Sequence, residues 1–435
     1  MTRRYFGTDG VRGIAGEFLD APLVERLGRA ATLWAGADRV FVGRDTRGSG
    51  PELEAALAAG IASAGGTAVL GGVLPSPAVA LGALDLGVVL TASHNPPEYN
   101  GVKFFKADGS KLSDTEEEQI EALLDAPPAA ERGSTEQAPE AGERYLAYVL
   151  DRFGSDLSDL RVAVDCANGA YSGLAAVAFE RLGAEVVAIG CAPDGSNINE
   201  GCGAMQPELL RRTVVEAGAS LGVAFDGDGD RIVAVDERGE LVDGDGIVAI
   251  LALDLGVELV AVTQMTNLGF HALMRQHGIR VVTTDVGDRY VLEALVAEGG
   301  VLGGEQSGHV IYLRDHVTGD GLAAALLLCS ALHGRPLGEL AAVVPRYAQR
   351  KANIRVATKE IGPILLGAIE RVNAELGEEG RVLVRPSGTE PLVRVLVEAA
   401  DDRMAEEACA TIAALVESEL GFGDPAPDVS ETASR

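Results

Sequence analysis

The sequence predicts an α/β protein of four domains, in which three similar α/β domains with mixed or parallel sheets precede a smaller C-terminal α+β domain. The first observation is a plan that occurs three times along the 435 residues. Each time an apolar, β-branched strand leads through a small-residue turn into an Ala/Leu-rich helix, a glycine and a second apolar strand, which is typical of a βαβ crossover. The second observation is a change of pattern after Pro345, where this plan ends.

The three repeats and the final unit set the expected boundaries. The repeats begin at Val40, Arg161 and Leu259, and the final unit holds short alternating strands, two amphipathic helices and a polar tail from Gly421. A stretch rich in Pro, Ala and charge, residues 125–143, is expected to be a surface excursion inside or just after the first domain. The expected domains are residues 1–154, 155–255, 256–348 and 349–435.

Charge excludes several classes of partner. The chain has 36 Lys and Arg against 65 Asp and Glu, so its formal net charge is −29. Such a molecule repels nucleic acids and anionic membrane surfaces, and we expect neither as a partner. Any phosphate site must therefore be built locally from the few cations available.

The sequence also favours a cytoplasmic protein. The first residues have no apolar segment for export, and the longest apolar run, Leu322–Leu332, is far shorter than the roughly 20 residues that a membrane span needs. The five cysteines form no C-x-x-C pair and leave an odd one out, which fits reduced, buried thiols.

The first loop that can carry chemistry follows the apolar strand ending at Leu90. Ser93 lies in the segment Thr-Ala-Ser-His-Asn-Pro-Pro, where the paired prolines prevent a helix from starting and hold the serine on a rigid loop. A serine hydroxyl is a weak nucleophile that needs a base, a cation or a transferable phosphate, and Lys103 is close enough in sequence to fold back over it. The alternative is that the segment simply caps a turn.

The second loop carries three aspartates at a spacing of two. Asp226, Asp228 and Asp230 follow an apolar strand, with Gly227 and Gly229 between them. On a straight strand alternate residues stand roughly 6.6 Å apart, too far for one small cation, but glycines let the backbone curl and bring the carboxylates together. An all-oxygen cage suits Mg²⁺ or Ca²⁺ and disfavours Zn²⁺. A solvated acidic turn is the alternative.

The aspartate loop is not an EF-hand. Its sixth position is Arg231, where that motif needs glycine, and its flanks have the pattern of strands instead of helices.

The third loop contains Glu305, Ser307 and His309 between apolar strands. Their spacing of two predicts three polar side chains projecting in one direction, which suits hydrogen bonding to sugar hydroxyls, with His309 as a candidate proton-transfer group. A structural role for each is the alternative.

The fourth loop joins two alternating strands near the C-terminus. Arg385 precedes Ser387, Gly388 and Thr389, and Arg394 returns on the second strand. Two guanidiniums with hydroxyls and free amides predict a phosphate clamp. A hairpin turn with exposed arginines is the alternative. Neither a Walker loop nor a dinucleotide-binding G-x-G-x-x-G is present, so ATP and NAD are not indicated.

These four loops in this order resemble the α-D-phosphohexomutase superfamily, together with the phrases YFGTDGVRG, VGRDTRGSG and GGEQSGH. The resemblance extends from Tyr5 to Glu398. It implies a heart-shaped protein of four domains whose loops meet in a central cleft.

The resemblance also implies roles for individual residues. Ser93 would carry a phosphate and share Mg²⁺, one ion per chain, with the three aspartates. The residues expected near the reacting oxygens are Arg12, Lys103, Arg231 and His309. The remaining substrate contacts would be His94, Glu305 and Ser307, and those to the phosphate that is not transferring would be Arg385, Ser387, Gly388, Thr389 and Arg394.

The activity implied by the resemblance is movement of a phosphoryl group between the 6- and 1-positions of a sugar. Phospho-Ser93 would phosphorylate glucosamine 6-phosphate, and the 1,6-bisphosphate would turn over and return its 6-phosphoryl group, releasing the 1-phosphate that feeds UDP-N-acetylglucosamine and cell-wall synthesis. Glucosamine or glucose 1,6-bisphosphate would be the activator. A phosphomannomutase or phosphoglucomutase activity and a non-catalytic binder of sugar bisphosphates stay open as alternatives. The expected partner is a small phosphosugar, and a homodimer is left open.

Overall fold

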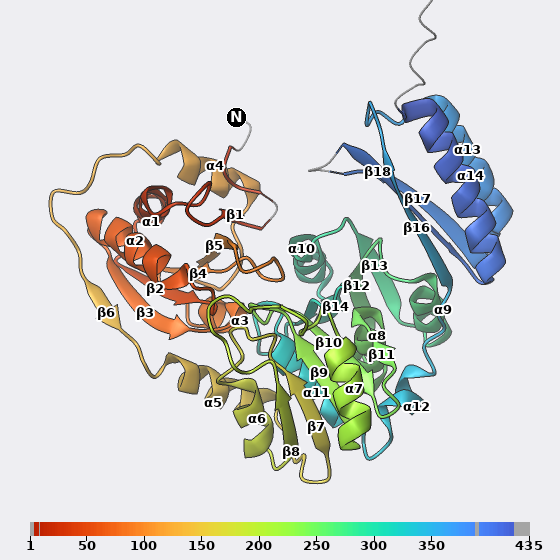
Figure 1. Cartoon of the computed structure of the whole chain (residues 1–435), viewed down its shortest axis with the longest axis horizontal. Coiled ribbons are helices and arrows are strands. Elements are labelled where there is room, and N and C mark those ends of the chain that lie inside the picture. Colours follow the sequence, from red (N-terminus) through yellow and green to blue (C-terminus); the bar gives the residue numbers. More distant parts are fainter. Residues whose placement is uncertain (1–3, 8, 388–390, 422–435) are drawn as a thin grey trace, which may run out of the picture. The chain divides into compact units, whose positions relative to one another are not determined.

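The computed structural model describes residues 4–7, 9–387 and 391–421, and these form two compact units. The first unit comprises residues up to Thr266 together with Met274–Val344, and the second comprises Asn267–Leu273 with the residues from Pro345 onward. The first unit holds three sheets and the second holds a fourth (Figure 1). The four-domain α/β fold expected from the sequence is thereby confirmed.

The first sheet is built around a parallel βαβ unit. Its strands are, in spatial order, β1 (Val11–Ile14), β5 (Tyr99–Lys106), β4 (Leu86–Leu90), β2 (Arg39–Arg44), β3 (Thr67–Val73) and β6 (Thr135–Gln137). Its helices are α1 (Ala21–Ala35), α2 (Gly50–Ser63), α3 (Ser76–Leu81), α4 (Asp114–Ala122) and α5 (Ala141–Phe153). Strand β2 is parallel to β3 and β4, whereas β5 is antiparallel to β4 and β1. Helices α1 and α2 approach closely because Gly60 lacks a Cβ, which would lie 2.0 Å from the Glu25 carbonyl oxygen.

The predicted surface excursion at residues 125–143 is only partly irregular. Its residues Thr135–Gln137 form β6, which pairs in parallel with β3 at the edge of the sheet, and α5 begins at Ala141. This strand was not predicted from the sequence, because all three of its side chains are polar and exposed and so form no alternating apolar pattern.

The second sheet repeats the parallel core and adds an antiparallel edge. Its strands are, in spatial order, β11 (Leu241–Val242), β10 (Ile232–Asp236), β9 (Leu221–Phe225), β7 (Arg161–Asp165) and β8 (Glu185–Ile189). Strand β7 is parallel to β8 and β9, while β10 is antiparallel to β9. The helices of this segment are α6 (Ala175–Arg181), α7 (Glu208–Ala217) and α8 (Gly244–Asp254).

The third sheet has four strands and the same parallel crossover. They are β13 (Arg280–Thr284), β12 (Leu259–Thr263), β14 (Leu302–Gly304) and β15 (Val310–Tyr312). The helices are α9 (Leu268–Gln276), α10 (Asp288–Glu298), α11 (Gly321–Ala331) and α12 (Leu337–Ala341). The three βαβ units predicted from the sequence are thus present as the parallel pairs β2–β3, β7–β8 and β12–β13.

The fourth sheet is entirely antiparallel, in the order β16 (Ala348–Arg355), β18 (Leu392–Ala399) and β17 (Gly380–Pro386). Helices α13 (Pro363–Leu376) and α14 (Asp402–Leu420) cover one face of it (Figure 1), with the short 3₁₀ helix η1 (Gly377–Glu379) between α13 and β17. Alternating apolar residues of β18 pack against both helices in one core. No helix in the described parts of the chain is long and apolar enough to cross a membrane.

The loops singled out in the sequence leave the carboxyl ends of strands in the first unit. Ser93 follows β4, Asp226 follows β9, and Glu305 follows β14. In open α/β sheets ligands bind at these ends, because the loops there are free of the packing that fixes the strands.

Candidate active site

Ser93 is held in a constrained backbone conformation at the end of β4. Its φ of 51° lies in the left-handed region, which is uncommon for a residue with a side chain, and the residue is buried. Its N–H donates to Thr91 Oγ1 at 2.9 Å, and its carbonyl oxygen accepts from Arg47 Nη2 and Asn199 Nδ2, each at 2.9 Å. These bonds offset a conformational cost of about 1–3 kcal/mol and fix the direction of the hydroxyl.

Arg47 is the main support of the serine loop, and the sequence did not single it out. Its side chain is fully buried, and its guanidinium donates to the carbonyl oxygens of Ser93, Asn95, Pro96 and Tyr99, while Nε donates to Asp45 at 2.9 Å. One planar cation thus binds three carbonyls of a loop that has no regular structure and a fourth at the first residue of β5. The phrase VGRDTRGSG contained it, but nothing in that phrase indicated a contact with a loop some 46 residues away.

Replacing Arg47 by methionine is expected to destabilise the first domain by about 3–5 kcal/mol, because Asp45 would lose its buried countercharge and each of the four carbonyls would lose a charged hydrogen-bond donor. Turnover should fall as well, because the loop that carries Ser93 loses its main support. Thermal melting and activity assays of Arg47→Met beside Arg44→Met provide the check. Arg44 is partly buried and paired with Glu54 outside this loop. Equal melting temperatures for the two variants would contradict the assignment.

The aspartate loop lies directly against Ser93. Asp226 Oδ2 accepts a hydrogen bond from Ser93 Oγ at 2.6 Å, although 133 residues separate them. Gly227 makes this approach feasible, because a Cβ at that position would lie 2.5 Å from the Ser93 carbonyl oxygen. Gly229 has a φ of 76° and leaves space for the Tyr171 ring, which a Cβ would meet at 2.3 Å. The two glycines therefore allow the loop to curl and also allow it to pack closely against Ser93 and Tyr171.

The three aspartates fit a divalent cation. All three are buried, and one oxygen from each lies within 4.8 Å of the other two. Asp228 Oδ1 and Asp230 Oδ1 are buried without a hydrogen-bond partner, which is costly unless another ligand serves them. Burial, together with repulsion from Asp228 and Asp230, raises the pKa of Asp226 well above its usual value. A hard cation would relieve both problems, so the donor set suits a metal site.

Lys103 already neutralises part of this charge. From β5 its ammonium reaches Asp228 Oδ2 at 2.7 Å, Asp230 Oδ2 at 3.4 Å and Asp9 Oδ2 at 3.0 Å. Burial alone would lower the pKa of Lys103, but the three carboxylates raise it, so the side chain stays protonated. Arg12, on the neighbouring strand β1, pairs with Asp9.

A second set of charges connects the first domain to the third. Lys111 Nζ contacts Asp9 Oδ1 at 2.8 Å and pairs with Asp288, the first residue of α10. His309 lies between Asp288 at 3.4 Å and Asp230 at 3.7 Å. Burial would lower the pKa of His309, but these two carboxylates raise it. The sequence analysis did not single out Lys111 or Asp288, and it included Asp9 only as part of the phrase YFGTDGVRG.

His94 and Arg231 cover the other side of the serine. His94 Nδ1 lies 3.3 Å from Ser93 Oγ and 3.4 Å from Arg231 Nη1. Burial, with the positive charges of Arg231 and Arg12, lowers the pKa of His94 to about 4, so its ring is neutral at pH 7. Arg231 is also anchored by its N–H, which donates to Asp226 Oδ1 at 3.2 Å.

The segment from Glu305 to His309 is a turn between two strands, so the spacing of two does not project all three polar side chains in one direction. Strand β14 ends at Gly304 and β15 begins at Val310. Glu305 is buried and accepts from the Gly287 N–H at 3.1 Å, whereas Ser307 is exposed. Gly308, with a φ of 96°, reverses the chain, which the spacing of two alone did not reveal. The structure therefore brings His309 into contact with the charged groups described above and Glu305 onto the backbone beside Asp288, whereas Ser307 is exposed.

The C-terminal arginines form a pair within the second unit. Arg385 on β17 lies directly opposite Arg394 on β18 in the antiparallel register. Burial, with repulsion from Arg394, lowers the pKa of Arg385. Ser387 is buried, and its carbonyl oxygen accepts from Lys359 Nζ at 2.7 Å. Like charges directly opposite are unfavourable, so this pair suits an anion. Gly388 and Thr389 lie outside the described residues.

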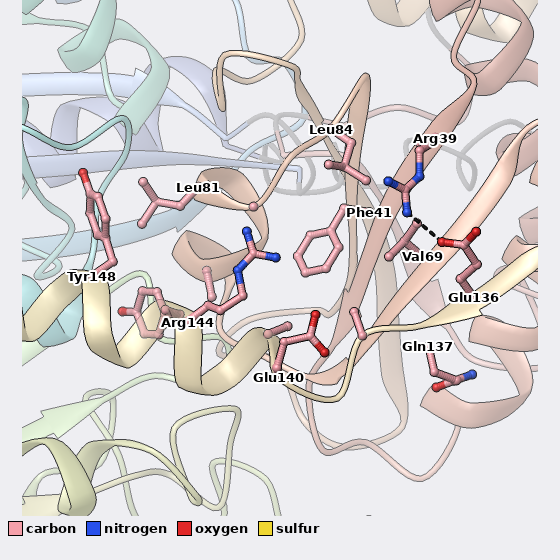
Figure 2. Close-up of a pocket in the computed structure, with 15 residues that line it drawn as sticks. Arg39, Phe41, Val69, Leu81, Leu84, Glu136, Gln137, Glu140, Arg144 and Tyr148 are labelled. Atoms are coloured by element: carbon pink, nitrogen blue, oxygen red, sulfur yellow. Dashed lines mark hydrogen bonds and ion pairs between the residues drawn. The ribbon is translucent and has the colours of Figure 1, made fainter.

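A sizeable cavity lies elsewhere. A cavity of about 390 Å³ is lined by Phe41, Leu81 and Leu84 together with Arg144 and Tyr148 of α5 (Figure 2). None of the predicted site residues lines it. The converging charges around Ser93, and not the size of a cavity, define the candidate site.

Comparison with known proteins identifies the class to which this fold and site belong. Four models of phosphoglucomutase/phosphomannomutase domains match the chain in order: domain I at residues 3–130, domain II at 143–239, domain III at 243–347 and the C-terminal domain at 343–415. The chain therefore belongs to the phosphoglucomutase/phosphomannomutase family of the α-D-phosphohexomutase superfamily.

Relatives that match over nearly the full chain are more specific. The phosphoglucosamine mutase of Moorella thermoacetica is 50% identical over 92% of this chain and 96% of its own length. The phosphoglucosamine mutase of Symbiobacterium thermophilum is 49% identical over 96% of this chain and 99% of its own length. Among solved structures, a phosphoglucomutase/phosphomannomutase family protein from Burkholderia thailandensis has a TM-score of 0.81 and 25% identity, covering 96% of this chain and 99% of its own.

Proposed function

We propose that the protein is a phosphohexosamine mutase that interconverts glucosamine 6-phosphate and glucosamine 1-phosphate and so supplies amino sugar for cell-wall precursors. One observation carries the proposal: the Ser93 hydroxyl, on a rigid loop, donates at 2.6 Å to a carboxylate of the buried aspartate trio. A serine held against a cation site and surrounded by Lys103, Arg231 and His94 has what phosphoryl transfer requires, namely position and compensating charge. The relatives named above support the amino sugar as substrate.

The proposed reaction uses Ser93 Oγ as the carrier of the phosphoryl group. Phospho-Ser93 gives its phosphoryl group to the 1-hydroxyl of glucosamine 6-phosphate, and the P–Oγ bond breaks as the bond to the sugar oxygen forms. In the proposal His309 takes up the proton of the 1-hydroxyl as the new P–O bond forms and passes it to Ser93 Oγ, which leaves the phosphoryl group as a hydroxyl. The 1,6-bisphosphate then turns over, and its 6-phosphoryl group returns to Ser93.

Charge compensation is shared among side chains in the first unit. Lys103 and Arg231 place two cations against the aspartate trio, and Arg12 pairs with Asp9, which Lys103 also contacts. When bound by Asp226, Asp228 and Asp230 with an oxygen of phospho-Ser93, Mg²⁺ would supply further positive charge to the transferring group. We propose one Mg²⁺ per chain. Glucosamine or glucose 1,6-bisphosphate would be the activator, since either can phosphorylate an unmodified Ser93.

The remaining site residues have binding roles in this proposal. His94, Glu305 and Ser307 contact the sugar, and Arg385, Ser387, Gly388, Thr389 and Arg394 bind the phosphate that is not transferring. The opposed Arg385 and Arg394 support this, because an anion would relieve their repulsion. We further propose a cytoplasmic enzyme with domain boundaries near residues 154, 255 and 348.

A comparison of turnover on glucosamine, glucose and mannose 6-phosphates tests which sugar phosphate is the substrate. We expect kcat/KM to be highest for glucosamine 6-phosphate by at least about tenfold, or about 1.4 kcal/mol. Higher activity on glucose or mannose phosphate would make the protein a phosphoglucomutase or phosphomannomutase. Binding of a sugar bisphosphate without turnover of any of the three would instead identify a non-catalytic binder.

A further inference from the structure

Two cysteines lie after adjacent parallel strands at the carboxyl end of the second sheet, outside the candidate active site. Cys166 directly follows β7 and is buried, and Cys191 follows the adjacent parallel strand β8 and is partly exposed. The Cys166 N–H and the Cys191 thiol both donate to the Ile189 carbonyl oxygen at 3.1 Å, which brings Cys191 back over the strand end. Gly190, with a φ of 58°, makes this reversal of the chain.

The two thiols differ in the way that disulfide chemistry needs. The mutual influence of the two thiols raises the pKa of Cys166 and lowers the pKa of Cys191, and burial further disfavours the Cys166 thiolate. Cys191 is therefore both the more accessible sulfur and the more readily ionised one, with Cys166 beside it as a resolving thiol. A third cysteine nearby, Cys202, is less suited, because burial raises the pKa of its thiol to about 12.

The segment after Cys166 touches both loops of the candidate active site. Ala167 and Asn168 have φ values of 55° and 48°, so two successive residues with side chains are left-handed. The Ala167 carbonyl accepts from the Asn199 N–H at 2.8 Å, and the Asn199 side chain holds the Ser93 carbonyl.

The same segment reaches the aspartate loop. The Ala170 N–H donates to the Gly227 carbonyl at 2.9 Å, one residue after Asp226. A displacement of Cys166 would therefore shift supports of both Ser93 and Asp226.

We propose that Cys166 and Cys191 form an oxidisable dithiol, a modification site at which peroxide makes a reversible disulfide and lowers activity. The Cys191 thiolate attacks one oxygen of hydrogen peroxide, so an S–O bond forms, the O–O bond breaks, and hydroxide leaves to become water. Cys166 then attacks the Cys191 sulfur, the S–S bond forms, and the sulfenic oxygen leaves as a second water with the Cys166 proton. Two electrons pass from the thiols to the peroxide.

Formation of the Cys166–Cys191 disulfide requires the two cysteines to move toward each other. The sulfurs of a disulfide lie about 2.05 Å apart, well inside the separation of two thiols that are not bonded, so Cys166 and its strained neighbours must shift. Misplacement of reacting groups by about 1 Å costs up to about 100-fold in rate, and we expect turnover to fall by about tenfold or more.

The test treats the full-length, reduced protein with a few equivalents of hydrogen peroxide and then alkylates the remaining thiols. Cleavage after Arg181 and Glu200 puts Cys166, Cys191 and Cys202 on three separate peptides. We expect a cross-linked Cys166–Cys191 peptide pair about 2 Da lighter than the sum of the two thiol peptides, with activity restored by dithiothreitol. Cys191→Ser should keep its activity under peroxide and give no cross-link, whereas the matched control Cys409→Ser should behave like the wild type.

Several results would overturn the proposal. These are full alkylation of Cys166 and Cys191 after peroxide treatment, a cross-link through Cys202 instead, or inactivation of Cys191→Ser to the same extent as the wild type. A Cys166–Cys191 cross-link that leaves turnover unchanged would contradict the coupling to the active site. The cross-link is measured without substrate, so a failure of the proposed mutase activity would be distinguished from a failure of the dithiol.

Discussion

Ser93→Ala is expected to lower kcat by at least about 10⁴-fold, because removing a nucleophile that forms the covalent intermediate typically costs this much or more. Alanine tolerates the left-handed backbone at this position no worse than serine, and the supports from Arg47 and Asn199 bind the backbone carbonyl. The variant should therefore fold normally and still bind sugar phosphates. Steady-state turnover and thermal melting, measured together, separate the loss of chemistry from a loss of structure.

A matched control is Ser63→Ala. Ser63 is also buried, and its hydroxyl donates to the Gly60 carbonyl within α2, far in sequence from the charged site. It should keep nearly full activity. Retention of more than about one hundredth of wild-type turnover by Ser93→Ala would show that this hydroxyl is not the phosphoryl carrier.

Asp228→Asn is expected to reduce turnover by about 10²-fold or more and to abolish stabilisation by Mg²⁺. The change keeps the size of the side chain but removes one of three buried charges and weakens the ion pair with Lys103. In the wild type, Mg²⁺ at about 100 times its Kd should add about 2.7 kcal/mol of stability. Thermal melting with and without Mg²⁺, in the absence of sugar, measures this without any assay of activity.

Asp236→Asn serves as the comparison for that experiment. Asp236 is equally buried at the end of β10, but its partners are Arg238 and local backbone amides. This variant should respond to Mg²⁺ as the wild type does. An unchanged Mg²⁺ response in Asp228→Asn would remove Asp228 from the metal site.

The parts of the fold with strong local patterns were predictable. The βαβ crossovers beginning at Val40, Arg161 and Leu259 combine a short apolar run, a helix of regular period and a glycine stop, and all three appear as parallel strand pairs. By contrast, β6 is short, polar and formed only by pairing with the edge of β3. Such a strand is defined by tertiary contact and has no signal of its own.

The candidate site likewise contains some residues that could be predicted from the sequence and others that could not. The aspartate loop was predictable because three carboxylates between glycines after a buried strand have few uses besides cation binding. The residues that place Ser93 were not. Arg47 and Asn199 act on backbone carbonyls of a distant loop, and Lys111 and Asp288 pair across 177 residues. Each is an ordinary charged or polar residue until the fold brings its partner near.

The most direct measurement locates phosphate on the protein. After incubation with glucose 1,6-bisphosphate and Mg²⁺, mass spectrometry of digested protein should find about 80 Da added at Ser93, and subsequent glucosamine 6-phosphate should remove it. An unmodified Ser93 peptide under conditions where the enzyme turns over, or the added mass on any other residue, would contradict the central claim.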